Sequence, residues 1–201
     1  MSAEKFLITG LPRTRAAWLS VFCTTGQSIC YHEPSTQISD LSELDRIFAS
    51  DFYKHVGIAD SGLGFFLDWI LENIKPRTLI VDRDPAEVTE LLVKLGVARS
   101  NYADLLHEKL MRFKSHPLVM WVPMEALQQK RVMQKVYWHL MPGEAFDEVR
   151  YEQLSKMTIE ADPTKVVNQA SQGRPAAMRL LAKMKPYIRL VDAGHESQLR
   201  H

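Results

Sequence analysis

The chain alternates between short apolar runs and longer stretches in which apolar residues recur at helical spacing. The apolar runs have the length of buried strands and lie at residues 6–10, 28–33, 56–60, 78–82 and 118–122. The amphipathic stretches lie at residues 15–24, 39–48, 65–74 and 101–114, and a further helix opens at Asp84-Pro85. Strands that alternate with helices predict a three-layer α/β fold, in which a parallel sheet is flanked by helices.

The last third of the chain has a different pattern. It turns helical from Met124 and stops at Pro142-Gly143, and Pro163 and Pro175 then have the positions of helix openers. We therefore predict a single α/β domain over residues 1–201, with a helical C-terminal part from about residue 125.

Composition adds constraints on partners and location. The apolar fraction of 46% is enough to bury the core of one domain of 201 residues. The 25 basic and 24 acidic side chains almost cancel, so we expect neither nucleic acid nor an acidic membrane surface as a partner. No apolar stretch reaches the ~18 residues of a membrane span, and the N-terminus lacks a signal-peptide pattern. We expect a cytoplasmic protein, of an oligomeric state that the sequence does not indicate.

Cysteine and histidine spacing argues against metal and hydrolase chemistry. Cys23 and Cys30 lack a Cys-x-x-Cys spacing and are predicted to be reduced and partly buried. No metal site is predicted, because His55, His107, His116 and His139 lack the spacing of metal ligands. A Ser/His/Asp hydrolase is excluded by the lack of a Gly-x-Ser-x-Gly turn.

The first strand ends in a turn suited to an anion. The apolar run breaks at Gly10, passes through Pro12-Arg13-Thr14-Arg15 and restarts as a helix at Ala16. A strand that turns into a helix places free backbone N–H groups and the positive end of the helix dipole at the edge of a sheet. Because arginine donates paired hydrogen bonds to tetrahedral oxyanions, Arg13 and Arg15 predict a phosphate or sulfate ligand. The alternative is a surface turn whose arginines are solvated or paired with acids.

The same turn is not an ordinary ATPase or GTPase loop. A Walker A loop needs Gly-x4-Gly-Lys-[Ser/Thr], in which the lysine reaches the terminal phosphates and the hydroxyl holds magnesium. Counted from Gly10, these three positions are Arg15, Ala16 and Ala17. A nucleotide or small-molecule kinase with an altered loop is therefore a disfavoured alternative.

The segment that follows Gly10 resembles the 5′-phosphosulfate-binding loop of the sulfotransferases, whose pattern runs roughly Gly-x-Pro-[Arg/Lys]-Ser-Gly-Thr-[Thr/Ser]-Trp/Leu-Leu. The matching residues are Gly10, Pro12, Arg13, Trp18 and Leu19, with Thr14 in place of the serine. Arg15 stands where glycine is usual, and Ala16 and Ala17 replace hydroxyl residues that help to hold the phosphosulfate. The resemblance implies a sulfotransferase-like fold of the P-loop NTPase type and 3′-phosphoadenosine 5′-phosphosulfate (PAPS) as donor, bound by residues 12–18.

A second match follows the run at 78–82. Sulfotransferases carry an Arg-[Asn/Asp]-Pro turn there, whose arginine binds the 3′-phosphate of PAPS, and Arg83-Asp84-Pro85 fits this turn. The family often has a serine eight residues after this arginine, where this chain has Leu91, so Thr89 and Arg174 are the candidates to replace that contact. The alternative is that Arg83 only pairs with Asp82 or Asp84.

A third match is His32-Glu33-Pro34. In several bacterial and Golgi-type sulfotransferases a glutamate after the second strand accepts the acceptor's proton, and Glu33 resembles it in position. Glu33 is the first candidate for the base and His32 the second, while Arg13 would stabilise the departing phosphate. The alternative is that either residue only hydrogen-bonds the loop or caps a helix. Asp60, Ser61 and Glu125 are lesser candidates for acceptor binding, and Ser61 is equally suited to cap a helix.

The three motifs together imply a metal-independent sulfotransferase, which transfers a sulfuryl group from PAPS to a hydroxyl or amine acceptor. A non-catalytic member of the fold, which binds a nucleotide, an anion or another protein, is the main alternative. Ala16, Ala17 and Leu91 favour that alternative. The acceptor itself cannot be read from the sequence, because variable loops build acceptor pockets.

Overall fold

The apolar runs form one parallel sheet. The computed structural model describes residues 3–36, 38–94, 101–157 and 159. Its strands are β1 (Glu4–Gly10), β2 (Ser28–His32), β3 (His55–Ala59), β4 (Arg77–Asp82) and β5 (Val119–Pro123), in the spatial order β2-β3-β1-β4-β5. Each neighbouring pair is parallel, so the carboxyl ends of the strands lie at one edge. Each strand overlaps its predicted range, and the predicted parallel sheet is confirmed.

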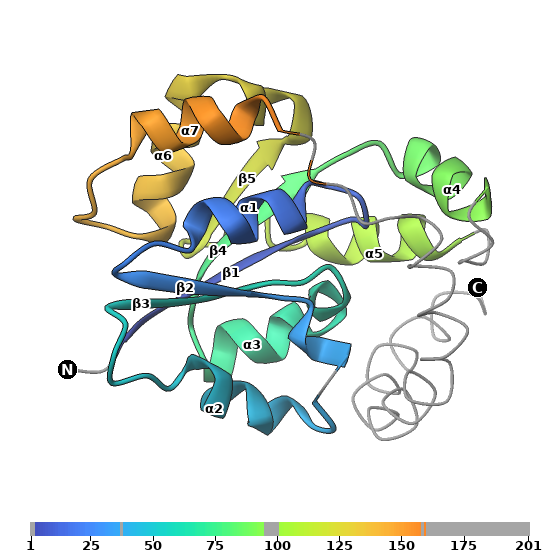
Figure 1. Cartoon of the computed structure of the whole chain (residues 1–201). Helices are drawn as coiled ribbons and strands as arrows, with labels where there is room; N and C mark the ends of the chain where they lie inside the picture. Colours follow the sequence, from blue (N-terminus) through green and yellow to red (C-terminus); the bar gives the residue numbers. More distant parts are fainter. Residues whose placement is uncertain (1–2, 37, 95–100, 158, 160–201) are drawn as a thin grey trace.

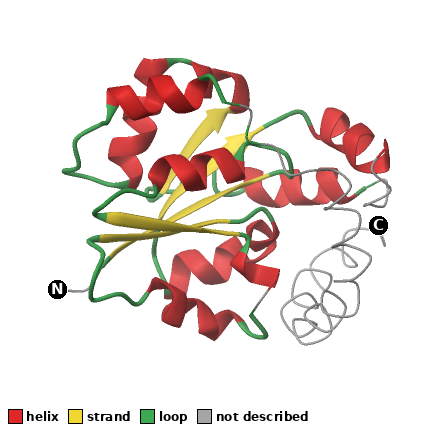
Figure 2. Ribbon diagram, in the orientation of Figure 1, coloured by secondary structure: helices red, strands yellow, loops and turns green. Residues whose placement is uncertain are grey.

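Helices cover both faces of this sheet (Figure 1). One face carries α1 (Ala16–Cys23), α6 (Lys130–Leu140) and α7 (Glu148–Ser155). The other carries α2 (Leu44–Phe48), α3 (Leu67–Asn73), α4 (Pro85–Lys94) and α5 (Tyr102–Met111). Successive residues of β4 point to opposite faces, so Leu79 and Val81 pack into the first core and Ile80 into the second. Colouring by secondary structure shows the resulting three layers (Figure 2).

Two predicted helices are divided in the structure. The expected helix at 39–48 consists of the 3-10 segment η2 (Leu41–Glu43) followed by α2, and the helix expected at 65–74 starts earlier, as η3 (Gly62–Phe66) followed by α3. The start of the first segment is set by a capping box, in which Asp40 accepts the Ser42 N–H and the Glu43 carboxylate accepts the Asp40 N–H. Two further 3-10 segments, η1 (Pro34–Thr36) and η4 (Met124–Gln128), lie in connections.

After β5 the described chain continues through η4, α6 and α7. α7 lies within the predicted helical C-terminal part, although the sequence pattern marked no separate helix there. The features predicted at Pro163 and Pro175 lie outside the described residues. Within the described part, no helix is long and apolar enough to cross a lipid bilayer.

Both cysteines are free, as predicted, and both are buried, where partial burial was expected. Cys23 ends α1 and Cys30 lies in β2. Burial raises the pKa of the Cys23 thiol to about 12 and that of Cys30 well above its usual value. Neither thiol is therefore suited to act as a nucleophile near neutral pH.

A buried histidine fixes the amino edge of the sheet, opposite the carboxyl ends. The side chain of His55, at the start of β3, is completely buried, and its Nε2 lies 3.2 Å from Oε1 of Glu144 in the α6–α7 connection. Its Nδ1 lies 3.7 Å from the carboxylate of Glu4 in β1. Lys54 Nζ donates to the same Glu144 oxygen at 2.6 Å. Glu144 thus ties the α6–α7 connection to two residues at the start of β3.

We expect Glu144→Gln to lower the free energy of unfolding at pH 7 by about 1 kcal/mol, because Lys54 and His55 lose a charged partner. The Lys54 hydrogen bond, followed by the smaller effects of His55, holds the pKa of Glu144 below its usual value despite partial burial. An acid whose folded pKa is lowered stabilises the fold above its unfolded pKa, and this contribution is lost as pH falls through the folded value. Urea unfolding at several pH values should show a difference between the two proteins that is full above the ordinary glutamate pKa of about 4.3 and shrinks as the pH falls below it.

The control is Glu90→Gln. Lys94 Nζ and Glu90 Oε1 are also 2.6 Å apart, but both side chains are exposed on α4, so screening by water makes the loss smaller. Equal losses in both variants, or a Glu144 effect independent of pH, would contradict this account of the amino edge.

Candidate functional site

The loop after β1 is shaped by its first residue. Gly10 has φ of 152°, and a Cβ atom there would overlap the carbonyl oxygen of Val81 in β4. Only glycine allows β1 and β4 to approach this closely while the chain turns away. Inside the turn, the buried Thr14 hydroxyl donates to the Leu11 carbonyl at 2.7 Å. Thr14 therefore braces the loop from within.

Both arginines of the loop have left-handed backbone conformations. Arg13 has φ of 68° and Arg15 has φ of 64°. This conformation costs an L-residue roughly 1–2 kcal/mol, and at Arg15 it occurs where the sulfotransferase pattern has glycine. Arg15 is the N-cap of α1 and makes no side-chain cap hydrogen bond. The amides of the first turn of α1 thus open at the same edge as the two arginines.

Arg83 joins the second motif to the first. Its Nη1 donates to the Arg13 carbonyl at 3.1 Å, and its Nε donates to Glu87 at 3.3 Å. The expected alternative partners are engaged elsewhere: Asp84 accepts the Ala86 N–H at 2.8 Å, and Asp82 lies 3.1 Å from His107 Nε2. The structure thus brings the two arginine motifs into direct contact across 70 residues of chain.

Trp18 of the loop motif points into the protein. Its side chain is only 4% exposed, stacks on Phe22 at 5.3 Å between ring centroids and donates from Nε1 to the Leu154 carbonyl at 2.9 Å. Leu154 belongs to α7, so the start of α1 is held beneath that helix. Its neighbours in the loop, Ala16 and Ala17, are half-buried and carry no polar side-chain atoms. Pro12 is also half-buried.

A cleft adjoins the start of α1. It has a volume of about 270 Å³ and lies between α1, η4 and α7, lined by Arg15, Trp18, Leu127, Gln128, Tyr151 and Ser155. Burial raises the pKa of Tyr151, and the positive charges of Arg15 and Lys130 oppose this rise. Lys130 is paired with Glu148 at 2.6 Å, whereas no described residue forms an ion pair with Arg15. The guanidinium of Arg15 is therefore the available cation of this cleft.

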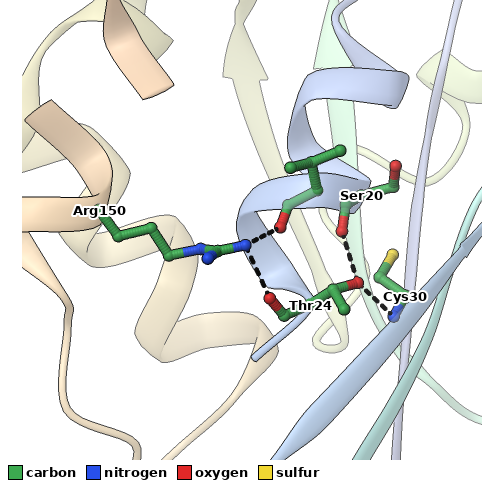
Figure 3. A pocket seen from close by; sticks show the side chains of 5 residues that line it. Ser20, Thr24, Cys30 and Arg150 are labelled. Atoms are coloured by element: carbon green, nitrogen blue, oxygen red, sulfur yellow. Dashed lines mark hydrogen bonds between the residues drawn. The ribbon is translucent and has the colours of Figure 1, made fainter. Parts of the chain in front are cut away.

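The far end of α1 is also fixed (Figure 3). Arg150 of α7 donates from Nη2 to the carbonyls of Val21 and Thr24, at 2.6 and 2.8 Å, where the helix dipole is negative. The Thr24 hydroxyl donates to the Ser20 carbonyl and accepts the Cys30 N–H of β2. These residues line a shallow groove of about 220 Å³. The helix that presents its amides at the loop is thus anchored to both α7 and the sheet.

Glu33 and His32 lie at the carboxyl end of β2. The Glu33 N–H donates to the Ala59 carbonyl at 2.9 Å, and Glu33 has a left-handed backbone with φ of 50°. Its carboxylate is 4.0 Å from His32 Nε2, and both side chains are largely accessible. The strand order places β3 between β2 and β1, so this pair lies at the same edge of the sheet as the loop, with the end of β3 between them.

Asp60, a lesser candidate in the sequence, is buried at the end of β3. Its carboxylate accepts the N–H groups of Ser35 at 2.9 Å and Leu63 at 3.2 Å. Burial raises the pKa of Asp60, against the lowering effect of these hydrogen bonds. The sequence suggested Ser61 as the cap of the following helix, but Ser61 makes no side-chain cap and Asp60 receives the N–H instead. Glu125 is exposed in η4.

The structure adds two residues of α5 to this edge. Burial raises the pKa of the Tyr102 hydroxyl to about 12, and the nearby charges of Asp60 and Glu33 add to the rise. His107 pairs with Asp82 at the end of β4 and contacts the ring of Trp121. The sequence did not indicate that Tyr102 and His107 lie near the strand ends, because other elements separate α5 from those strands along the chain. It indicated only that both residues belong to the predicted helix at 101–114.

Two further predictions concern a replacement contact to the phosphate and a metal site. Arg174, predicted to replace a missing phosphate contact, lies outside the described residues, while Thr89 and Leu91 both lie on α4. Within the described ranges, no three side chains of His, Cys, Asp or Glu are grouped closely enough to hold a metal ion.

Two solved structures share this architecture. A sulfotransferase from Alicyclobacillus acidocaldarius matches with a TM-score of 0.50 and 13% identity, over 90% of this chain and 96% of that one. A mouse sulfotransferase complexed with PAP matches with a TM-score of 0.53 and 10% identity, over 98% of this chain and 90% of that one. No family model and no curated protein sequence matches the chain. At these identities the likeness concerns the fold, and the resemblance inferred from the three motifs is confirmed at that level: the chain has the sulfotransferase fold.

Proposed function

We propose that the chain binds PAPS at the carboxyl edge of the sheet and transfers its sulfuryl group to a hydroxyl or amine acceptor. The observation that carries this proposal is the hydrogen bond from Arg83 to the Arg13 carbonyl, because it unites the two arginine motifs at one anion site. The shared fold, and the PAP bound to the mouse sulfotransferase of that fold, support the choice of donor.

In the proposed complex, the loop amides and the first turn of α1 hold the 5′-phosphosulfate. Arg13 and Arg15 add guanidinium groups to the same anion, and Arg83 contacts the 3′-phosphate. The cleft between α1, η4 and α7 receives the nucleoside end, since it adjoins the loop and has aromatic and polar lining groups. The contact from the Arg15 guanidinium compensates for the hydroxyl contacts that are missing at Ala16 and Ala17.

The proposed reaction is an in-line displacement at sulfur. The acceptor oxygen or nitrogen forms a bond to sulfur while the bond from sulfur to the bridging oxygen of the 5′-phosphate breaks, and that oxygen leaves with the electron pair as part of PAP. The acceptor's proton passes to the Glu33 carboxylate, which is 53% exposed and therefore accessible. Arg13 stabilises the charge that develops on the departing phosphate. His32 is the second candidate for the base.

The main alternative is a non-catalytic member of the fold that keeps the anion site. Ala16, Ala17 and Leu91 favour it, because each lacks a polar group that the sulfotransferase pattern supplies. Binding of PAP without release of PAP from PAPS, against any acceptor, would support this alternative. Magnesium-dependent binding of ATP would instead support a kinase, which the loop sequence disfavours.

Donor binding is tested by calorimetric titration with PAP. We expect saturable binding to the wild type and about tenfold weaker binding to Arg83→Lys, because lysine keeps the charge and loses the two-pronged hydrogen bonding. The matched control is Arg112→Lys at the exposed C-cap of α5, which should bind like the wild type. Absence of binding to the wild type at about 1 mM PAP would overturn the donor assignment.

The role of Arg15 is tested by Arg15→Gly, which restores the residue of the sulfotransferase pattern. We expect PAP affinity to fall about tenfold and its salt dependence to weaken, because a cation is lost from the site. Stability should hold or rise by up to about 1 kcal/mol, since glycine relieves the left-handed strain while adding entropy to the unfolded chain.

Lys75→Gly provides the matched control. Lys75 also has a left-handed backbone, with φ of 57°, but lies at the end of α3. The stability of the Lys75→Gly protein should change in the same direction as that of Arg15→Gly, while its affinity for PAP stays constant. Unchanged or tighter binding of PAP by Arg15→Gly would show that Arg15 only occupies the turn.

A further inference from the structure

Asp60 connects three segments that border the proposed site. Its side chain is buried, with the residue 1% exposed, although it is a carboxylate at the edge of the sheet. Its backbone N–H donates to the Ile8 carbonyl of β1 at 2.9 Å, and its carboxylate accepts from Ser35 in η1 and Leu63 in η3. Burial of an acid is costly unless hydrogen bonds satisfy its oxygens, and here both oxygens accept from backbone amides.

Glu33 stands between two of these anchor points. Its own N–H is bonded to the Ala59 carbonyl, one residue before Asp60, and two residues further on the Ser35 N–H is bonded to the Asp60 carboxylate. In between, Glu33 has φ of 50° and precedes Pro34. This conformation is unfavourable for an L-residue, and the ring of a following proline restricts it further. Both hydrogen bonds therefore act to hold Glu33 in a conformation that it would otherwise leave.

We propose that Asp60 is a positioning residue, whose carboxylate holds the backbone of Glu33 so that the Glu33 side chain meets the acceptor. This inference rests on the proposed function, in which Glu33 accepts the proton. The same carboxylate orders η3, whose Phe65 packs edge-on against Tyr102 of α5 with ring centroids 5.3 Å apart. Asp60 thereby fixes both the residue that takes the proton and the neighbouring aromatic wall.

The first test is the backbone conformation of Glu33 in Asp60→Asn, read from the NMR chemical shifts of its Cα, Cβ and carbonyl carbons. An asparagine side chain offers one acceptor oxygen in place of two, so it presents a donor instead of an acceptor to the N–H of Ser35 or of Leu63. We expect the Glu33 shifts to move from left-handed toward extended values. The control is Asp40→Asn, which disturbs a similar side-chain bond to a backbone amide at η2 and should leave Glu33 unchanged.

Ser35→Ala provides a milder variant in case Asp60→Asn does not fold. The Ser35 hydroxyl also bonds to Asp60, so its removal weakens the contact without changing the charge. We expect a smaller movement of the Glu33 shifts in the same direction. Unchanged Glu33 shifts in every folded variant would overturn the proposal.

The second test is a double-mutant cycle on the release of PAP from PAPS, with water as the acceptor. When Glu33 is present, we expect Asp60→Asn to slow the release of PAP about tenfold. In a Glu33→Gln background the same change should slow release less than about twofold, because Asp60 acts through Glu33. PAP affinity should stay within about twofold throughout, since the loop is held by other residues. Equal slowing in both backgrounds would contradict a positioning role for Asp60.

Lack of PAP binding by the wild type would instead contradict the proposed function. The NMR test needs no donor, so it still decides whether Asp60 holds the backbone of Glu33.

Discussion

The hydrogen bond from Arg83 to the carbonyl of Arg13 is the contact on which the site depends. It joins the end of β4 to the loop after β1, and it does so beside Gly10, whose lack of a Cβ lets these two strand ends meet. A guanidinium held in this way has a defined orientation and keeps further donors for an anion. The α1 helix, anchored by Trp18 at one end and Arg150 at the other, supplies its amides to the same edge.

Backbone strain is concentrated around this edge. Of the four non-glycine residues with positive φ in the described chain, Arg13, Arg15 and Glu33 border the site, and Lys75 ends a helix. A residue with this backbone conformation needs surrounding contacts that hold it. Arg13 is held by the hydrogen bond from Arg83, Arg15 by its place as the N-cap of α1, and Glu33 by the hydrogen bond from the nearby Ser35 N–H to Asp60. The arrangement is consistent with a site that is organised before any ligand binds.

The sequence was sufficient for the sheet and for the turn between β1 and α1, because short apolar runs and a strand-turn-helix boundary are local signals. It could not indicate that Trp18 turns into the core beneath α7, since α7 has only a weak amphipathic pattern. Nor could it pair Asp60 with Ser35, or His107 with Asp82, because these contacts depend on which strand ends become neighbours. The glycine position occupied by Arg15 was a usable hint of a left-handed backbone, which the structure retains.

The central claim is that one site binds both phosphates of the donor nucleotide, the 5′-phosphate in the loop and the 3′-phosphate at Arg83. It is tested most directly by comparing the affinities of PAP and adenosine 5′-phosphate, which lacks the 3′-phosphate. We predict that PAP binds at least about tenfold more tightly, a difference of ~1.4 kcal/mol, and that the preference disappears when Arg83 is replaced. Equal affinity for the two nucleotides, or a preference that survives replacement of Arg83, would contradict it.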